Sequence, residues 1–271
     1  MPIKNSMKLD KDLCSKCGIC ADVCPGNIMS IGEDGYPKSD RLAFCITCGH
    51  CVAHCPNEAI ELEVVTLKEQ QKKPAPLPKE QAVSFLRGRR SVRKYKQENV
   101  PHDLMRELLD VARMAPTGGN TQGLSFFVIE DKETLSKISG AVLNFIEKGS
   151  AEGKLPGAYG IMAADARKTG RDIILRGAPC LVVAHASELM PLRKDNARFA
   201  LTYAELFAPS LGLGSCWAGF VDMCAFSGYS ELLELIKFPE GHFYCAAIMV
   251  GFPKYKCYRM VDRKPLNISW Q

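Results

Sequence analysis

Residues 14–25 read CSKCGICADVCP, and residues 45–56 repeat the pattern as CITCGHCVAHCP. Both stretches have the spacing Cys-x2-Cys-x2-Cys-x3-Cys-Pro. Two-residue gaps fold a loop so that successive thiolates converge on one metal centre, whereas the fourth cysteine, which a proline follows, is directed elsewhere. The repeat therefore predicts two metal centres within the first 62 residues, which otherwise read as short turns around the cysteines.

This repeat resembles the bacterial two-cluster ferredoxin family, and the resemblance covers residues 7–62. In that family the fourth cysteine of each run binds the cluster of the other run. The resemblance implies two [4Fe–4S] clusters, a low-potential one-electron carrier and two halves related by pseudo-symmetry. The implied ligands are Cys14, Cys17, Cys20 and Cys55 for the first cluster, and Cys45, Cys48, Cys51 and Cys24 for the second.

Two other uses of these cysteines remain as alternatives. Structural zinc usually shows paired C-x2-C knuckles instead of three cysteines in a row. Disulfides usually spread through a secreted scaffold, but here eight of the 13 cysteines fall between Cys14 and Cys55. The five later cysteines read as core residues or free thiols. Apolar residues expected to wrap the clusters are Ile19, Val23, Ile28, Ile31, Ile46, Val52 and Ile60.

Composition excludes several classes of protein. The chain has 271 residues, of which 46% are hydrophobic and 24% charged, as in ordinary globular proteins. Residues 1–62 hold 6 Lys+Arg against 8 Asp+Glu, and the remainder holds 29 against 22. The net charge of +7 on residues 63–271 suits an anionic cofactor or substrate. It is too weak and too dispersed to indicate nucleic-acid binding. The longest uncharged stretch, residues 206–221, is too short and too rich in glycine for a membrane span. The first residues lack an apolar signal segment, so we expect a cytoplasmic protein.

A proline-rich segment separates two differently patterned regions. Residues 63–80, EVVTLKEQQKKPAPLPKE, show little periodicity and predict an extended linker between a domain at 1–62 and a second at 81–271. In the second domain, hydrophobic periodicity predicts helices and strands in alternation, which indicates a mixed sheet covered by helices. The expected helices are 79–89, 101–115, 131–148, 194–211 and 231–237, and the expected strands are 126–130, 180–186, 215–220 and 243–251.

Four segments of the second domain are candidates for ligand binding. Residues 87–94 carry four arginines, whose guanidinium groups match phosphates or carboxylates, although a charge run is usually a solvated surface. The loop APTGGNTQG at 115–123 offers glycines and polar side chains near a ligand. The segment GLGSCWAGF at 212–220 either exposes backbone amides to a flat cofactor or forms a tight corner of the core. The fourth candidate is Gly251-Phe-Pro253 together with the later Arg263-Lys-Pro265, in which Arg263 is a further cation that could bind a phosphate.

In their order and spacing these segments resemble the FMN-dependent nitroreductase family over most of residues 82–270. The resemblance implies an α+β sandwich with a mainly antiparallel sheet. It also implies an intertwined homodimer that binds one FMN at each of its two interfaces. The overall fold class is thus α+β, with a two-cluster ferredoxin-like domain ahead of a nitroreductase-like domain.

The resemblance also implies roles for individual residues. Arg89 and Arg263 correspond to ligands of the FMN phosphate, and Arg93 corresponds to a basic residue that tunes the reduced flavin near its pyrimidine edge. No other catalytic residue is assigned, since the chemistry is centred on the flavin. The remaining residues implied to bind the cofactor are Arg90 and Ser91 at the phosphate end, Asn120 and Gln122 near the ring or ribityl chain, and Trp217, Ala218 and Gly219 near N5.

The two resemblances together predict an oxidoreductase in which two [4Fe–4S] clusters feed electrons to FMN. The acceptor would be an electron-poor organic molecule such as a nitro compound, a quinone or an activated alkene. The donor would be an external ferredoxin-like protein or NAD(P)H. The alternative is an electron-transfer or redox-sensing module that binds flavin and clusters without turning over a substrate.

Overall fold

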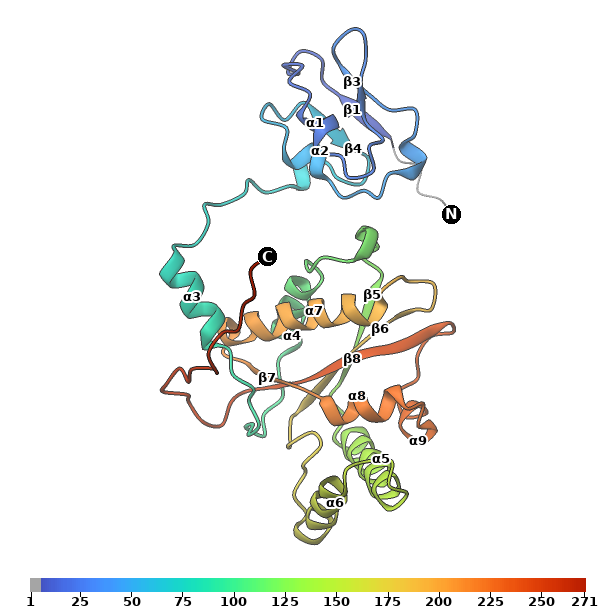
Figure 1. Cartoon of the computed structure of the whole chain (residues 1–271), viewed down its shortest axis with the longest axis vertical. Coiled ribbons are helices and arrows are strands. Elements are labelled where there is room, and N and C mark those ends of the chain that lie inside the picture. Colours follow the sequence, from blue (N-terminus) through green and yellow to red (C-terminus); the bar gives the residue numbers. More distant parts are fainter. Residues whose placement is uncertain (1–5) are drawn as a thin grey trace. The chain divides into compact units, whose positions relative to one another are not determined.

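A computed structural model of the chain describes residues 6–271, except for the side chain of residue 69. The chain divides into two compact units (Figure 1), which are described separately. The first comprises Met1–Pro76 and Gly119–Thr121, and the second comprises Leu77–Gly118 and Gln122–Gln271.

The first unit is built from very short elements that surround the cysteine runs. Its two antiparallel pairs are β1 with β4 and β2 with β3. One short helix lies within each cysteine run. The elements are β1 (Met7–Leu9), α1 (Ile19–Asp22), β2 (Ser30–Ile31), β3 (Pro37–Lys38), η1 (Leu42–Phe44), α2 (His50–Ala53), β4 (Ile60–Leu62) and η2 (Leu67–Glu69).

The two halves of the first unit follow the same backbone path. Gly18 and Gly49 precede α1 and α2 with φ of 76° and 72°, in the left-handed region that favours glycine. Asn27 and Glu58, three residues after the last cysteine of each run, also share positive φ values of 47° and 54°. The sequence repeat is therefore matched by a repeat in local backbone geometry.

The core of the first unit is small. Ile28, Val52 and Ile60 are buried as expected. In contrast, Ile19, Ile31 and Ile46 are more than a third exposed, although Ile19 borders a cavity lined by Cys14, Cys17, Cys20 and Cys55. A unit of this size exposes too much surface per residue to bury every apolar side chain. The buried cluster consists of Ile28, Met29, Cys51, Val52, Ile60 and Leu62.

A four-stranded sheet forms the centre of the second unit. Its strand order is β5-β6-β8-β7, and every neighbouring pair is antiparallel. The central strand β6 is buried almost throughout, because it carries the continuous apolar run Cys-Leu-Val-Val-Ala. The strands are β5 (Leu124–Ile129), β6 (Cys180–Ser187), β7 (Gly214–Trp217) and β8 (His242–Gly251).

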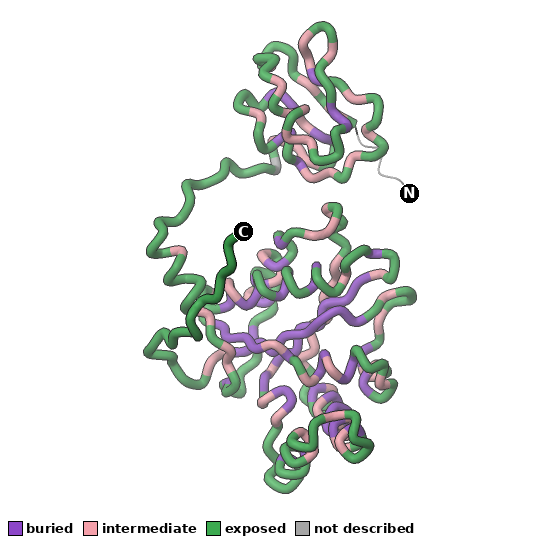
Figure 2. The backbone as a smooth tube through the Cα atoms, viewed as in Figure 1, coloured by how far each residue is buried: buried purple, intermediate pink, exposed green. Residues whose placement is uncertain are grey.

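Helices cover both faces of this sheet, as Figure 1 shows. Along β6, Leu181 and Val183 face a cluster that includes α5, α6, α8 and α9, whereas Val182 and Ala184 face α4 and α7. Figure 2 shows the resulting band of buried residues along the strands. The helices are α3 (Lys79–Gly88), α4 (His102–Ala112), α5 (Lys132–Ala151), α6 (Gly157–Thr169), α7 (Arg193–Phe207), α8 (Gly219–Phe226) and α9 (Ser230–Leu233), with 3-10 turns η3 (Gly118–Asn120) and η4 (Ala208–Leu211). Within residues 6–271, none of the helices combines the length and apolar character needed to cross a membrane.

The α+β sandwich implied by the nitroreductase resemblance is confirmed, but the mixed sheet expected from periodicity alone was wrong. All four strands pair antiparallel. Ser91 forms an isolated parallel bridge with Ser215 of β7. Ser91 itself lies outside the four strands. Strand direction depends on long-range connections, so the hydrophobic pattern of individual strands does not determine it.

One expected strand and two expected helices end earlier than the sequence predicted. The strand expected at 215–220 ends at Trp217, and α8 begins at Gly219, because a short apolar run fits either a strand or a helix. The helix expected at 194–211 changes at Ala208 into a 3-10 turn that contains Pro209, which lacks an amide donor. The helix expected at 231–237 is only Ser230–Leu233. The sequence reasoning also missed α6, whose buried residues are only Ala163 and Ala166.

Candidate functional site

The first predicted set of cysteines lies around one cavity in the first unit. Cys14, Cys17, Cys20 and Cys55 all line it, so a thiol from the second run joins three from the first. The Ala59 amide donates a 3.2 Å hydrogen bond to Cys55 Sγ. Amide donors to sulfur help to set the potential of an iron–sulfur cluster. The cavity therefore has the donor set that a [4Fe–4S] cluster requires.

The second set is arranged around a more buried thiol. Burial raises the pKa of Cys51 to about 11, and the neighbouring thiols of Cys45 and Cys48 add to that shift. Cys24 packs, half-buried, against the same apolar cluster that contains Cys51. The amide of Thr47 donates to Cys45 Sγ at 3.4 Å, as Ala59 does to Cys55. Both runs thus provide thiols together with backbone donors to sulfur.

The cysteines are not spaced as ligands of one ion. Among residues 6–271, no three His, Cys, Asp or Glu side chains are grouped closely enough to hold a single metal ion. A mononuclear site needs all its ligands within bonding distance of one point, about 2.3 Å for zinc and sulfur. A cubane instead offers four separate iron atoms, so its ligands surround a larger body.

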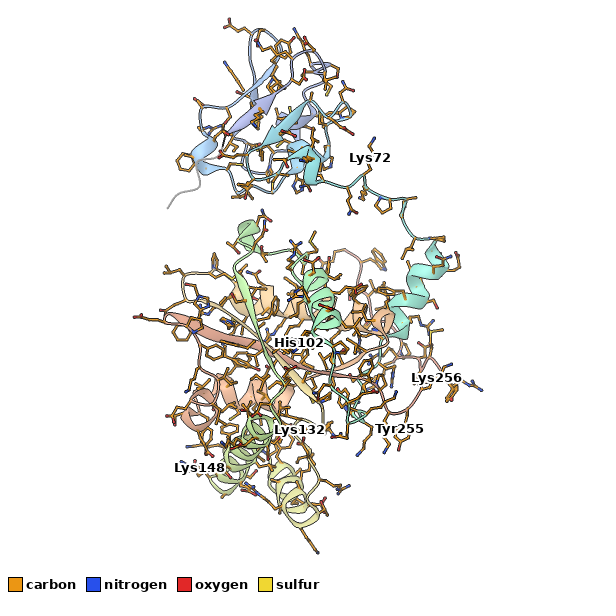
Figure 3. All side chains as sticks on the ribbon, turned by 180° about the vertical axis from the view of Figure 1, so that it is seen from behind. Lys72, His102, Lys132, Lys148, Tyr255 and Lys256 are labelled. Atoms are coloured by element: carbon orange, nitrogen blue, oxygen red, sulfur yellow. The ribbon has the colours of Figure 1, made fainter. Side chains whose placement is uncertain are left out.

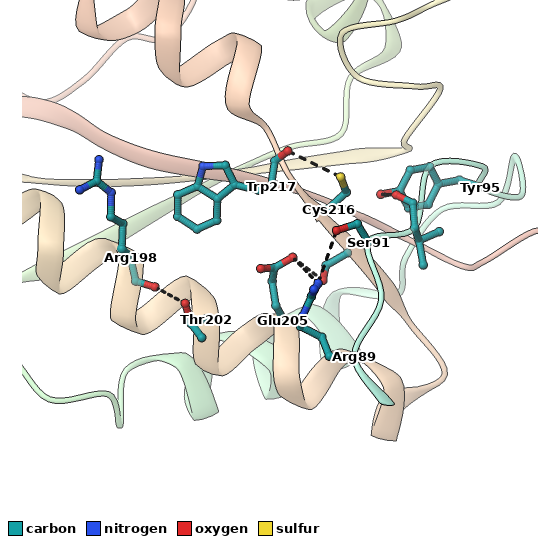
Figure 4. A network of polar contacts seen from close by, with 10 residues as sticks. Arg89, Ser91, Tyr95, Arg198, Thr202, Glu205, Cys216 and Trp217 are labelled. Atoms are coloured by element: carbon teal, nitrogen blue, oxygen red, sulfur yellow. Dashed lines mark hydrogen bonds and ion pairs between the residues drawn. The ribbon is translucent and has the colours of Figure 1, made fainter. Parts of the chain in front are cut away.

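In the second unit, the predicted arginine run contributes to a polar network at the end of α3 (Figure 4). Arg89 Nη1 lies 3.7 Å from Glu205 Oε1 and 3.5 Å from Ser91 Oγ. Ser215 Oγ donates to the same Glu205 oxygen at 3.3 Å. The bridge between Ser91 and Ser215, with the Val92 amide donating to the Ser215 carbonyl at 2.8 Å, brings the two segments together. The segment that follows α3, helix α7 and strand β7 therefore meet at one point.

Glu205 was not predicted from the sequence. It is 8% exposed, and burial raises the pKa of its carboxyl, whereas Arg89 and the Ser215 hydroxyl oppose that shift. One signal was present in the sequence: Glu205 follows Leu201 by four positions and therefore lies on the buried face of α7. A charged residue on such a face is expected to have a specific partner.

The other predicted arginines lie at the surface. Arg90 and Arg93 are exposed, and the charge of Arg93 opposes the rise that burial causes in the pKa of Cys216. Arg263 is exposed in the C-terminal segment, and its amide donates to Asp262 Oδ1 at 2.9 Å. The same oxygen accepts from Arg87 Nη2 at 3.4 Å. The structure thus places the segment of Arg263 beside the end of α3 but shows no contact between its guanidinium and Arg89.

The predicted loop residues have strained backbone conformations. Asn120 and Gln122 have φ of 54° and 49°, which is uncommon for residues with a side chain. The Gln122 amide donates to Thr117 Oγ1 at 3.1 Å, and the Gly118 amide donates to Asn196 Oδ1 at 3.0 Å. The hydroxyl of Thr117 is therefore used to shape the loop. Strain of this kind concentrates at functional sites.

A buried carboxylate fixes the segment 217–219. Asp222 Oδ2 accepts from Trp217 Nε1 at 2.7 Å, and Asp222 Oδ1 accepts from the Tyr244 hydroxyl. Burial raises the pKa of Asp222, while both hydrogen bonds oppose that shift. The Ala218 amide donates to the Ala247 carbonyl at 3.0 Å, so it is already used within the fold. The amide that begins α8 belongs to Gly219, an exposed residue, and a helix leaves its first amides unpaired.

The glycines of the GLGS motif serve the fold. Gly212 ends the turn η4 with a φ of 71°. A Cβ atom on Gly214 would lie 2.4 Å from Val92 Cγ2, so β7 can approach this segment only with glycine at that position. Of the two interpretations of this segment, the structure favours the tight corner for Gly212 and Gly214.

The histidines outside the cysteine runs are accounted for by local contacts. His102 is exposed at the start of α4 and pairs with Glu130 at 2.8 Å (Figure 3). His185 is buried beside Phe127, and its Nδ1 lies 3.0 Å from His242 Nδ1. None of these contacts involves the arginine network.

Comparison with known proteins extends these observations. Residues 86–252 match the nitroreductase family, and residues 6–56 match the 4Fe-4S dicluster domain. A relative from Archaeoglobus fulgidus, named a putative NADH dehydrogenase/NAD(P)H nitroreductase, is 25% identical over 65% of this chain and 87% of its own length. An uncharacterized ferredoxin from Methanocaldococcus jannaschii is 34% identical over 23% of this chain and 83% of its own length.

A solved structure has the same fold as the second unit. It is a nitroreductase with bound FMN from Desulfitobacterium hafniense, 20% identical, with a TM-score of 0.55 over 69% of this chain and 97% of that one. The two-cluster class predicted for residues 7–62 is confirmed by the dicluster match. The chain therefore belongs to the nitroreductase family and carries, ahead of its nitroreductase domain, a 4Fe-4S dicluster ferredoxin domain.

Proposed function

We propose that this FMN-dependent oxidoreductase takes single electrons from an external donor through two [4Fe–4S] clusters and delivers them from FMN to an electron-poor organic acceptor. Nitro compounds, quinones and activated alkenes are the acceptor classes. The observation that carries the proposal is that one chain combines a cavity lined by four cysteines with a nitroreductase fold. FMN joins the two types of chemistry because it exchanges electrons either singly or in pairs.

For the clusters, we propose the two crossed ligand sets. Cys14, Cys17, Cys20 and Cys55 line one cavity, which supports the first set. The second set, Cys45, Cys48, Cys51 and Cys24, is supported by the shared backbone geometry of the two halves and by the packing of Cys24.

The crossed sets make a specific prediction about Cys24. The substitution Cys24→Ala should damage the cluster bound by the second run and leave the cluster of its own run in place. We expect roughly half of the bound iron to be lost, because each set holds one cluster. Iron and sulfide counts after anaerobic purification test this, and retention of all the iron would exclude Cys24 as a ligand.

For FMN, the residues of the second unit have the chemistry that its phosphate requires. Arg89 is half-buried and held in place, and guanidinium groups bind phosphate through paired hydrogen bonds. Arg90, Ser91 and Arg263 complete the proposed phosphate end. Relatives with bound FMN share this fold, which supports the assignment.

At the other end of FMN, this chain would orient and shield the ring. The Gly219 amide would serve the N5 side of the ring, and Trp217, held by Asp222, would supply a fixed aromatic wall. Arg93 would place a positive charge near the pyrimidine edge, where it stabilises negative charge on the reduced ring. The polar loop of Asn120 and Gln122 is assigned to the ring edge or the ribityl chain.

The flavin sites are proposed to form in a homodimer. The C-terminal segment after β8 exposes several large apolar side chains, which soluble monomers seldom leave uncovered together. Light scattering of the purified protein should give the mass of two chains, and a monomer that retains FMN would contradict this part of the proposal. The exposed residues include Tyr258, Met260, Val261, Leu266, Ile268 and Trp270.

The proposal makes the clusters the route by which electrons reach the flavin. Mixing the anaerobic protein with a reduced ferredoxin should bleach the flavin absorbance, and destroying the clusters should abolish that bleaching. The relative from Archaeoglobus fulgidus is named for NAD(P)H, so NAD(P)H is the competing donor. Equally fast reduction by NAD(P)H after both clusters are lost would show that the relay is not required.

Turnover separates the enzyme from its alternative. Sustained consumption of a model nitro compound, with two electrons used per molecule reduced to the nitroso product or four per molecule reduced to the hydroxylamine, supports the oxidoreductase. A protein that binds both cofactors and cycles between redox states without consuming any acceptor class would instead be an electron carrier or redox sensor.

A further inference from the structure

The contacts of Arg89 leave one edge of its guanidinium available. Both of its described contacts use Nη1, which faces Glu205 Oε1 at 3.7 Å and Ser91 Oγ at 3.5 Å. A guanidinium carries five N–H donors in a rigid planar fork. Within the described part of the chain, no hydrogen bond involves Nε or Nη2 of Arg89. These two atoms form the side-on edge that binds a phosphate with two parallel hydrogen bonds.

Glu205 is itself held from a second direction. Its side chain is 10% exposed, and its Oε1 accepts from Ser215 Oγ at 3.3 Å. Ser215 lies in β7, where its carbonyl accepts the Val92 amide at 2.8 Å. The carboxylate is therefore fixed by the sheet, and not by Arg89 alone. Figure 4 shows Glu205 reaching from α7 towards the guanidinium of Arg89, with Ser91 on the other side of that group.

We propose that Glu205 is a positioning residue that holds Arg89 by Nη1, so that the Nε and Nη2 edge is presented to the FMN phosphate. This inference rests on the proposed FMN site at Arg89. Holding a long side chain in its bound orientation before the ligand arrives reduces the entropy lost on binding. Glu205 acts through Arg89 and does not touch FMN itself.

A buried carboxylate near a phosphate also has an opposing effect. Its negative charge repels the phosphate, and this repulsion would weaken FMN binding in the unaltered protein. The two effects predict opposite results when the charge is removed and the shape is kept. Glu205→Gln does this, because the amide retains an oxygen that accepts from Ser215.

The experiment compares two ligands that differ only in the phosphate. The flavin-depleted full chain, with its clusters intact, is equilibrated by dialysis under anaerobic conditions with FMN or with riboflavin. Glu205→Gln should raise the dissociation constant of FMN by roughly three- to tenfold, which corresponds to about 0.7–1.4 kcal/mol and lies within the coupling energies known for such polar networks. The dissociation constant of riboflavin should not change. The matched control Asp195→Asn removes an exposed carboxylate from the same helix and should change neither constant.

Two further variants test the route of the effect. Arg89→Ala should weaken FMN binding, and adding Glu205→Gln to it should weaken binding no further, since the favourable effect of Glu205 requires Arg89. Ser215→Ala removes the hydroxyl that holds the carboxylate and should cause a smaller loss that is again specific for FMN. The Ser215 variant keeps the test valid if Glu205→Gln does not fold.

The results that would contradict the role of Glu205 can be told apart from those that would contradict the proposed phosphate site. An unchanged or lower dissociation constant for FMN in Glu205→Gln would overturn the positioning role, as would an equal loss for FMN and riboflavin. If Arg89→Ala weakens FMN selectively while Glu205→Gln has no effect, only this inference fails. If Arg89→Ala affects neither ligand, the proposed phosphate site fails as well, and with it the basis for a role of Glu205.

Discussion

The two units bury apolar side chains to very different extents. The first has one small cluster that includes the buried Cys51, whereas the second has a cluster on each face of its sheet. Small units with little apolar core usually need metals or disulfides to fold, and binding energy from the metal then contributes directly to folding. The comparison indicates that cofactors stabilise the first unit, while the second is stabilised by its own packing.

The largest expected effect follows from removing iron. Chelation of iron from the air-oxidised protein should abolish the protection of β1 and β4 against hydrogen exchange while leaving β6 and β8 protected. The reason is that loss of the clusters leaves the cysteine runs without the bonds that join them. Hydrogen exchange followed by mass spectrometry gives both results in one sample. Retained protection in β1 and β4 would show that the small core holds the first unit together without the clusters.

The complementary substitution removes a side chain from the core of the second unit. Leu181→Ala removes a fully buried side chain from β6, which should lower the free energy of unfolding by about 2–5 kcal/mol. The iron content should not change, because the eight predicted cysteine ligands lie in the other unit. Urea unfolding followed by tryptophan fluorescence measures the loss. Leu189→Ala, at a position 90% exposed, is the control and should remain within about 0.5 kcal/mol of the parent.

The two units also differ in how far their site residues could be predicted from the sequence. A cysteine run holds most of its site within a few residues, so spacing alone predicted two metal centres. Arg89 and Glu205 lie far apart in the chain, and only the pairing of Ser91 with Ser215 brings their segments together. The arginine run was therefore recognisable as a candidate, but its partner was not. The hydrophobic pattern did not give the direction of the strands, because it depends on long-range connections; the antiparallel sheet was predicted only through the family resemblance.

At the phosphate end of the proposed flavin site, we expect an effect of about 1.4 kcal/mol. Arg263→Ala should weaken FMN retention by about tenfold, because one charge-assisted contact to the phosphate is lost. Flavin content after exhaustive dialysis measures this. Arg259→Ala, in the same C-terminal segment, should retain flavin as the parent does. Unchanged flavin content in Arg263→Ala would remove this residue from the proposed site.

The smallest expected effect is a pH dependence within the second unit. Burial lowers the pKa of His185, and the neighbouring His242 lowers it further. The folded protein therefore takes up a proton at His185 less readily than the unfolded chain, whose histidines titrate near pH 6.5. Below that pH the unfolded state binds more protons, so the free energy of unfolding should fall as the pH drops from 7.5 towards 5.

His185→Gln should make this fall shallower, because the side chain keeps its polarity but no longer titrates. Unfolding in urea at several pH values, followed in β6 and β8 by hydrogen exchange, isolates the response of the second unit. His102→Gln is the matched control, since His102 is exposed and pairs only at the surface. An equal slope in His185→Gln and the parent would mean that the buried histidine contributes nothing to acid sensitivity. A difference confined to the second unit would show that its packing responds to protons at a single buried side chain.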